Sequence, residues 1–283
     1  MNALVKRIKV PTFSRSALEI ADLCARDIWR GVSYKEGTVI ESDESFLKLF
    51  ASPFLNYIYL EKIGDNHITH DSIDTLIKVA GLKAMKLSSA TTDIQQGLDT
   101  LYFGVSRLVK TWIEENNKVE KIDKETGEIS SRNKDKTSSL EIGIQAVSAL
   151  GEGFFTIGGN KKRGSFIALS SRLLFFALPQ IKIYNYSTDV AQKLGFDTTN
   201  PSLIIRDYTY TLDEGFTENW QYLREFEMPF SHNIINERLW TLAYDSGWWQ
   251  RRVYDLALVL HITGVSPRDF LKGLTLTEPK QNP

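Results

Sequence analysis

The chain has 283 residues, of which 42% are hydrophobic and 24% charged, and this composition suits a globular protein with a sizeable core. Its formal net charge of −1 excludes attraction to nucleic acid by overall charge, so DNA binding would need a local basic patch. The single cysteine, Cys24, excludes an internal disulfide, and we expect it as a buried, inert thiol. No apolar run is long enough for a signal peptide or a membrane helix, so we expect a cytoplasmic protein with no membrane partner.

The N-terminal region is predicted to be helical. Its first helix has helical periodicity over Ala17–Trp29, and Gly31 ends it. Ser14 or Ser16 can cap this helix, and Glu19 follows Ser16 at the spacing of a capping box. Further helices are predicted at Phe46–Leu60 with an interruption at Pro53, from Thr69 to about Ala80, and at Gln95–Asn116.

A charged segment, residues 117–138, is nearly free of large apolar side chains. Within it, Val119–Asp123 and Glu128–Ser130 flank Lys124–Gly127, a pattern typical of an exposed β-hairpin with glycine at the turn. A flexible loop is the alternative, because opposite charges nearly cancel here and little surface could be buried. Either structure separates the helical region before it from the residues after it.

The stretch from Gly151 to Gly195 has the highest density of special residues in the chain. It contains a glycine-rich basic turn, then an apolar helical segment that stops at Pro179. A short β-rich piece, Ile181–Tyr184, leads to Asn185 and a second short helix. A glycine turn between helices can present backbone N–H groups and lysines to a phosphate. The turn consists of Gly158, Gly159, Asn160, Lys161, Lys162, Arg163 and Gly164.

The C-terminal part is predicted to return to helices after a short extended region. We expect extended structure at Leu203–Ile205 and Tyr208–Tyr210, and helices at Ile234–Ala243, at Trp248–Ile262 and after Ser266-Pro267. The predicted fold is mainly α with a small β-hairpin insertion. Its regions are residues 1–116, the insertion 117–138 and residues 139–283, and the first and last can form one continuous domain.

Motifs for metal or cofactor chemistry are scarce. His67 and His70 have a spacing that could serve a metal, but no cysteine or carboxylate pair accompanies them, and a solvated loop is favoured. The sequence has no phosphate-binding loop, no dinucleotide fingerprint and no nucleophile elbow. We therefore predict neither a metal nor a cofactor.

Tryptophans and arginines near the C-terminus invite a nucleic-acid interpretation. Trp240, Trp248 and Trp249 could stack on bases, but their helical spacing among apolar residues favours core packing. Arg251 and Arg252 could contact phosphate, and a solvated helix face is favoured for them. Both alternatives remain open at the level of sequence.

The Gly151–Gly195 stretch resembles bacterial proteins with an 8-oxoguanine DNA glycosylase fold, a branch of the helix-hairpin-helix glycosylases. The resemblance implies a helix-hairpin-helix domain that binds DNA, and it covers roughly a seventh of the chain. The residues that carry it are Ser165-Phe166, Ser171-Arg172-Leu173-Leu174, Phe176, Pro179 and Ile183-Tyr184-Asn185-Tyr186-Ser187.

The resemblance also implies a site. The hairpin from Gly158 to Gly164 would hold a DNA phosphate, and its basic residues would add salt-sensitive affinity. Such glycosylases extrude a nucleotide and use an aspartate after the hairpin, but Asn185 occupies that position here. Asp189 is the nearest acid that could replace it, although an acid there also suits the first turn of a helix. A lysine nucleophile stays unassigned, since neither Lys161 nor Lys162 can be placed in a pocket.

Three functional hypotheses follow. The leading one is a DNA-binding protein with a glycosylase-like fold and lost or reduced base-excision activity, in genome maintenance or in defence against foreign DNA, including antiviral defence. The second is an active DNA glycosylase that uses Asp189. The third is a non-catalytic subunit of a protein complex, in which the aromatic C-terminal helices form the interface with other subunits.

Overall fold

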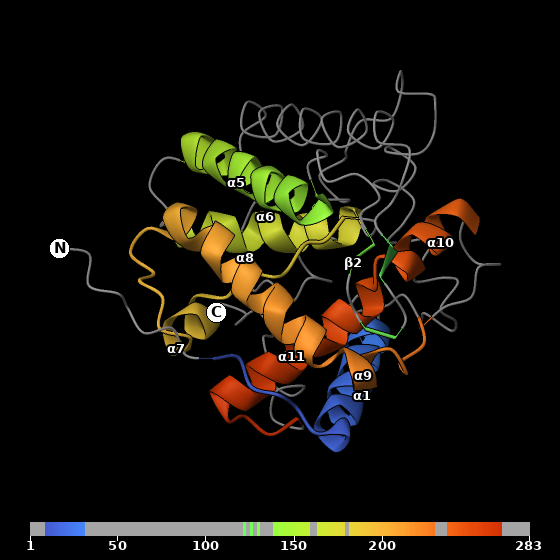
Figure 1. Cartoon of the computed structure of the whole chain (residues 1–283). Helices are drawn as coiled ribbons and strands as arrows, with labels where there is room; N and C mark the ends of the chain where they lie inside the picture. The colour runs from blue at the N-terminus through green and yellow to red at the C-terminus, as the bar shows by residue number, and fades with distance from the viewer. Residues whose placement is uncertain are drawn as a thin grey trace, which may run out of the picture.

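A computed structural model of the chain describes residues 9–31, 121–122, 125–126, 129–130, 138–158, 163–178, 181–229 and 237–267. These residues are mainly helical, as predicted (Figure 1). The helices predicted between Phe46 and Asn116, the pair His67 and His70, and most of the helix after Pro267 lie outside the described residues. The helices are α1 Arg15–Gly31, α5 Ser139–Gly158, α6 Arg163–Ala177, α7 Thr188–Lys193, α8 Pro201–Glu218, α9 Trp220–Leu223, α10 Glu237–Asp245 and α11 Trp248–Thr263.

The hairpin alternative is confirmed for the charged insertion. Strands β1, Lys121–Ile122, and β2, Ile129–Ser130, pair in antiparallel fashion. Lys121 lies opposite Ser130 and Ile122 opposite Ile129, and Glu125 and Thr126 lie in the turn. Both strands lie within the two segments predicted to flank Lys124–Gly127.

Helix α1 begins and ends near the predicted residues, and of the two predicted caps Ser14 is the one that forms. The backbone N–H of Ala17 donates to Ser14 Oγ at 3.3 Å, so Ser14 is the capping residue. Glu19 forms an ion pair with Arg15 at 3.1 Å, so the capping box with Ser16 is not formed. The helix ends at Gly31, as predicted.

Helices α5 and α6 pack side by side in opposite directions (Figure 1). Ser170 Oγ of α6 donates to the Val147 carbonyl of α5 at 2.9 Å. One turn further along α5, Gly151 lies so close to Ile167 that an added Cβ would be 2.6 Å from its Cδ1. The two predicted helices on either side of the glycine-rich turn are therefore confirmed, and glycine permits their close approach.

The extended structure predicted around Leu203–Tyr210 is wrong, because these residues lie in α8. Pro201 stands at the first position of this helix, where a missing N–H costs nothing. The buried side chains on α8 include Ile205, Tyr208 and Leu212, whose spacing of three and four places them on one face. Helical burial thus outweighs the preference of β-branched and aromatic residues for strands.

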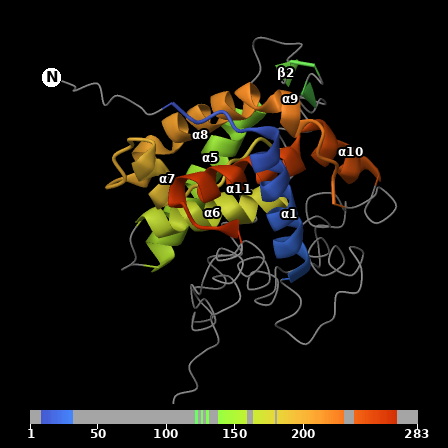
Figure 2. The ribbon, with the colours of Figure 1, turned by 90° about the horizontal axis from the view of Figure 1, so that it is seen from below.

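Helix α11, near the C-terminal end of the described residues, packs against α1, near their N-terminal end (Figures 1 and 2). It contacts α1, α7, α9 and α10, and it follows α10 directly, as the sequence predicts. Trp249 Nε1 donates to Asp22 of α1 at 2.7 Å, and Trp248 Nε1 donates to the Phe175 carbonyl of α6 at 2.9 Å. Residues far apart in sequence are therefore held together by buried hydrogen bonds.

A second polar link ties the N-terminal segment to α8. Asn219 Oδ1 accepts from the Phe13 N–H at 2.7 Å, and its Nδ2 donates to the Gly215 carbonyl at 2.7 Å.

No helix in the described part of the chain combines the length and the apolar character that a bilayer crossing requires.

Gly215→Ala tests this packing. A Cβ at this position would lie 2.1 Å from Tyr254 Oη and 2.8 Å from Val10 Cγ1, so the N-terminal segment or α11 would have to move. We expect the free energy of unfolding to fall by about 1–3 kcal/mol in urea titrations. Glu214→Ala, an exposed neighbour on the same helix, is the control and should change stability by less than about 0.5 kcal/mol. Equal effects of the two substitutions would contradict the packing.

Candidate functional site

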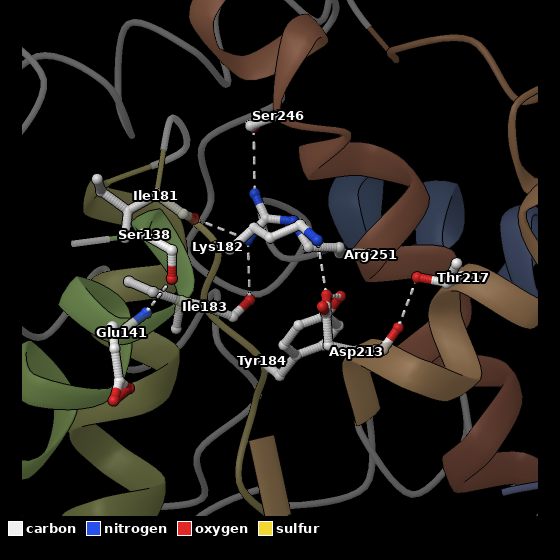
Figure 3. A network of polar contacts seen from close by, with 10 residues as sticks. All are labelled: Ser138, Glu141, Ile181, Lys182, Ile183, Tyr184, Asp213, Thr217, Ser246 and Arg251. Carbon is white, nitrogen blue, oxygen red and sulfur yellow. Dashed lines mark hydrogen bonds and ion pairs between the residues drawn. The ribbon is translucent and has the colours of Figure 1, made fainter. Parts of the chain in front are cut away.

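The segment Ile181–Ser187, between α6 and α7, has no regular secondary structure. The β-rich piece predicted at Ile181–Tyr184 is therefore wrong as a strand. Its backbone carbonyls are satisfied by a side chain instead: Arg251 Nη1 donates to the Ile181 carbonyl at 2.7 Å and to the Ile183 carbonyl at 3.0 Å (Figure 3). Arg251 Nη2 also donates to Ser246 Oγ at 3.1 Å. One guanidinium thus replaces the neighbouring strand that a sheet would supply.

Arg251 is an interior residue. Only 1% of its surface is exposed, so the solvated helix face favoured by the sequence is wrong for this residue, and so is a phosphate contact. Burial lowers the pKa of Arg251 to about 10, and the proximity of Tyr184 and Asp213 opposes the shift. A charge buried this deeply persists only where it is well hydrogen-bonded, which its carbonyl acceptors provide.

A second polar contact ties the same segment to α8. Lys182 Nζ and Tyr184 Oη both donate to Asp213 Oδ1, each at 2.7 Å (Figure 3). The Lys182 side chain is 3% exposed and that of Asp213 19%. Burial, and next Asp213, raise the pKa of Tyr184 well above its ordinary value, so its hydroxyl stays a donor. The backbone that leads to Asn185 is therefore fixed from two sides.

Asn185 is buried, with 2% of its surface exposed. Its Nδ2 donates to Asp255 Oδ2 of α11 at 3.0 Å, and its backbone carbonyl accepts from Tyr208 Oη of α8 at 3.1 Å. Its Oδ1 is buried and accepts no hydrogen bond from the described residues. The amide therefore orients a carboxylate that the sequence analysis did not single out.

That carboxylate belongs to Asp255, whose side chain is 10% exposed. Arg252 Nη1 donates to the same Oδ2 at 3.2 Å. Burial raises the pKa of Asp255, while Arg252, Asn185 and Arg172 act against the shift. Burial likewise lowers the pKa of Arg172 in α6, and Asp255 is close enough to oppose this. We call Arg172, Asn185, Arg252 and Asp255 the Asn185 cluster.

Asp189 lies elsewhere. It is exposed, in the first turn of α7, where Ser187 is the capping residue and its Oγ accepts from the Val190 N–H at 3.5 Å. An acid at this position complements the positive end of the helix. The structure does not bring Asp189 into the buried cluster with Asn185, and the catalytic role of Asp189 stays a prediction.

The predicted DNA-binding turn is described only at its ends. Gly158 is the last residue of α5, and Arg163 and Gly164 are the first residues of α6. Gly159, Asn160, Lys161 and Lys162 lie outside the described residues. What the structure establishes is that the turn joins two antiparallel helices, with the positive end of α6 directed to it.

The aromatic residues of the C-terminal helices behave as core. Trp248 and Trp249 are 3% and 1% exposed, which confirms core packing over base stacking for these two. Trp240 is partly buried and stacks on Tyr244 with ring centroids 4.9 Å apart. The signal that could have revealed Asp255 is its position three residues after Arg252, a spacing that places the two side chains on one face of the helix.

The chemistry of the Asn185 cluster has to follow from its own side chains. No family model, no curated protein and no solved structure matches the chain. Among the described residues, no group of three or more histidine, cysteine, aspartate or glutamate side chains is arranged to hold a metal ion, and Cys24 is buried as predicted. The cluster offers one carboxylate, one carboxamide and two guanidiniums. A carboxylate in this setting can stabilise positive charge and accept a proton.

Arg251→Met tests the support of the Ile181–Ser187 segment. The substitution keeps an apolar stem but leaves the carbonyls of Ile181 and Ile183 without their donor. We expect the free energy of unfolding to fall by about 2–4 kcal/mol in urea titrations. Arg224→Met, at an exposed position, is the control. A loss no greater than that of the control would contradict the role given to Arg251.

Asp255→Asn tests the burial of the carboxylate through pH. Because the folded-state pKa of Asp255 is raised above 3.8, folding disfavours its ionised form, and wild-type stability declines as pH rises from about 3.8 through that folded value. The variant cannot ionise, so its stability deficit relative to wild type should shrink over this pH range and then stay constant. Urea titrations between about pH 3 and pH 7 measure the difference. A deficit that grows with pH would contradict the shift, and Glu214→Gln serves as the exposed control.

Proposed function

We propose that this chain is a DNA-binding protein with a helix-hairpin-helix, glycosylase-like fold and lost or reduced base-excision activity. The observation that carries the proposal is the antiparallel pair α5 and α6, joined through a glycine-rich basic turn. Such a turn lets backbone N–H groups approach a phosphate closely, since glycine has no Cβ to obstruct it. The setting in genome maintenance or defence against foreign DNA comes from the resemblance alone.

Charge supports the same surface. The chain as a whole carries a net charge of −1, so only a local patch can attract DNA. Lys161, Lys162 and Arg163 are consecutive, and they precede or begin the helix whose positive end faces the turn. Cations and a helix N-terminus at one place favour the same ligand, the phosphate backbone. This affinity would be independent of base sequence.

The state of Asn185 supports loss or reduction of base excision. An amide cannot stabilise a positive sugar as a carboxylate does, and this amide is buried against Asp255. Asp189, the acid proposed as a substitute in an active glycosylase, is exposed on α7. Lost or reduced activity therefore suits this site better than full activity through Asp189.

The alternative of a protein-complex subunit has weaker support in α11. Trp248, Trp249 and Tyr254 are buried within the chain, so they are not free to form an interface. Exposed apolar side chains occur instead at Leu23 of α1 and Leu203 of α8, which are 62% and 76% exposed. Single exposed leucines are common on protein surfaces and do not by themselves define a partner.

DNA binding across a salt series tests the proposal. We expect fluorescence anisotropy with labelled duplex and single-stranded DNA to give a Kd of about 1 µM or below at about 50 mM NaCl, weakening steeply towards about 300 mM as counterion release is suppressed. Lys161→Glu/Lys162→Glu should weaken binding at least about tenfold, because like charge would then face the phosphates.

The control is Lys193→Glu/Arg224→Glu, which changes the net charge equally at exposed positions of the described surface. An equal loss in both double variants would show general electrostatics and contradict a site at the turn. Absence of wild-type binding at the lowest salt would reject the proposal, and size-exclusion chromatography with light scattering would then test for a protein assembly.

A further inference from the structure

We propose that the outer face of α8 is an interaction surface for a second copy of this chain, whose own α8 docks there as an antiparallel, two-fold related helix. The inference goes beyond the proposed function and does not depend on DNA binding. It begins from exposure. Among the large apolar side chains of the described residues, Leu203 has the greatest exposed fraction, 76%, and Tyr210 on the same helix is 38% exposed.

The exposed residues of α8 form one stripe. Leu203, Arg206, Asp207, Tyr210 and Glu214 are exposed, and their spacings of three, one, three and four positions are those of a helix-packing seam. The other face of α8 is buried, and the helix contacts α5, α6 and α9. Figures 1 and 2 show α8 at the outside of the described helices. The helix therefore has a second face with the side-chain pattern of a helix–helix contact.

Contacts within the chain orient two side chains of the stripe. Arg206 forms an ion pair with Glu141 of α5, with Nη2 2.5 Å from Oε1, and its guanidinium lies over the Tyr210 ring, 6.0 Å from the ring centroid. The Arg206 side chain still keeps 64% of its surface exposed, and a guanidinium carries five N–H donors, so it can bind a further carboxylate. Side chains that are ordered before association lose less entropy when a partner binds.

A two-fold axis pairs the stripe with itself. In such an interface every contact occurs twice, and in antiparallel helices the residues equidistant from the axis face each other. An axis between Arg206 and Asp207 places Arg206 of each copy opposite Asp207 of the other. Leu203 lies three positions before Arg206 and Tyr210 three positions after Asp207, so the same axis places Leu203 opposite Tyr210. The stripe is thus complementary to itself in charge and in apolar character, which is the argument for a second copy as its occupant.

An axis through Tyr210 is less favourable. It forms an arginine–glutamate pair, but it sets Asp207 opposite Asp213 and Leu203 opposite Thr217. Like charges that face each other oppose association, and the apolar side chain with the greatest exposure would face a hydroxyl-bearing residue. The axis between Arg206 and Asp207 is therefore the one assigned.

The seam is short, so the dimer is expected to be weak. Helix α8 has 18 residues and spans about 27 Å. One pair of helices of this length buries less than the roughly 1,600 Å² of a standard interface, and we expect a dissociation constant of about 10–100 µM.

Sedimentation velocity of the full chain from about 1 to about 300 µM tests the inference, and we expect a shift from monomer to dimer over this range. Leu203→Ser should weaken dimerisation at least about tenfold, because apolar area at the centre of the contact is lost. Since Leu203 is 76% exposed in the monomer, urea titrations of this variant should give wild-type stability.

A charge exchange tests the pairing of Arg206 with Asp207. Arg206→Glu should weaken dimerisation at least about tenfold, because it sets acid opposite acid. Arg206→Asp/Asp207→Arg should recover the wild-type dissociation constant to within about threefold. Arg224→Glu, the same change at an exposed position outside α8, is the control and should leave dimerisation unchanged.

Cysteine cross-linking tests the antiparallel arrangement. A mixture of Leu203→Cys and Tyr210→Cys should form a disulfide-linked dimer under mild oxidation, because these positions lie level across the axis. Leu203→Cys alone should form it at least about tenfold more slowly, since the two copies of position 203 are about 10 Å apart along the helices. The wild type is the control, because its single cysteine, Cys24, is buried.

Three outcomes would overturn the inference. A monomer at all concentrations rejects self-association. A dimer that neither Leu203→Ser nor Arg206→Glu weakens lies on another face of the chain. Cross-linking of Leu203→Cys alone at the rate of the mixture rejects the antiparallel arrangement. None of these results changes the test of DNA binding, which the salt series measures separately.

Discussion

The hydrogen bonds from Arg251 to the carbonyls of Ile181 and Ile183 are the constraint on which the rest of the structure depends. The segment that they hold has no sheet or helix of its own, yet it is buried and connects α6 to α7. A buried backbone without partners would cost a large part of the stability of a domain, so α11 supplies a guanidinium in their place. The position of Asn185 follows from that contact and from the bonds of Lys182 and Tyr184 to Asp213.

Neighbouring residues of helix α11 both support the backbone of the Ile181–Ser187 segment and form part of the Asn185 cluster. Arg251 points to the Ile181–Ser187 segment, whereas Arg252 and Asp255 meet at the Asn185 cluster. Trp249 reaches Asp22 of α1, and Trp248 reaches α6. The site is therefore assembled from α6, the segment before α7 and the C-terminal helix, and its geometry exists only when these parts are packed. Such long-range polar contacts favour one arrangement of the core over its competitors.

Elements with strong local signals were predictable. The first helix, the helices on both sides of the glycine-rich turn, the short helix after Asn185, α10, α11 and the small hairpin all carry periodicity or turn residues that act over a few positions. The prediction failed at α8, where Leu203–Ile205 and Tyr208–Tyr210 favour strands locally but share a buried helical face. The predicted solvated position of Arg251 was also wrong. Charged residues are rarely buried without a partner, and the partners of Arg251 are backbone carbonyls about 70 positions away, which the local sequence does not indicate.

The sequence by itself determined the helical class of the described chain, the caps and ends of several helices, the buried tryptophans Trp248 and Trp249, and the presence of an amide at position 185. These depend on side-chain pattern and backbone preference over short distances. Only the tertiary structure decided that Asn185 faces Asp255, that Arg251 lies in the interior, and that Asp189 stays at the surface. The physical reason is that hydrogen bonds between buried groups depend on which elements pack together, and 70 intervening positions leave no local trace of that contact.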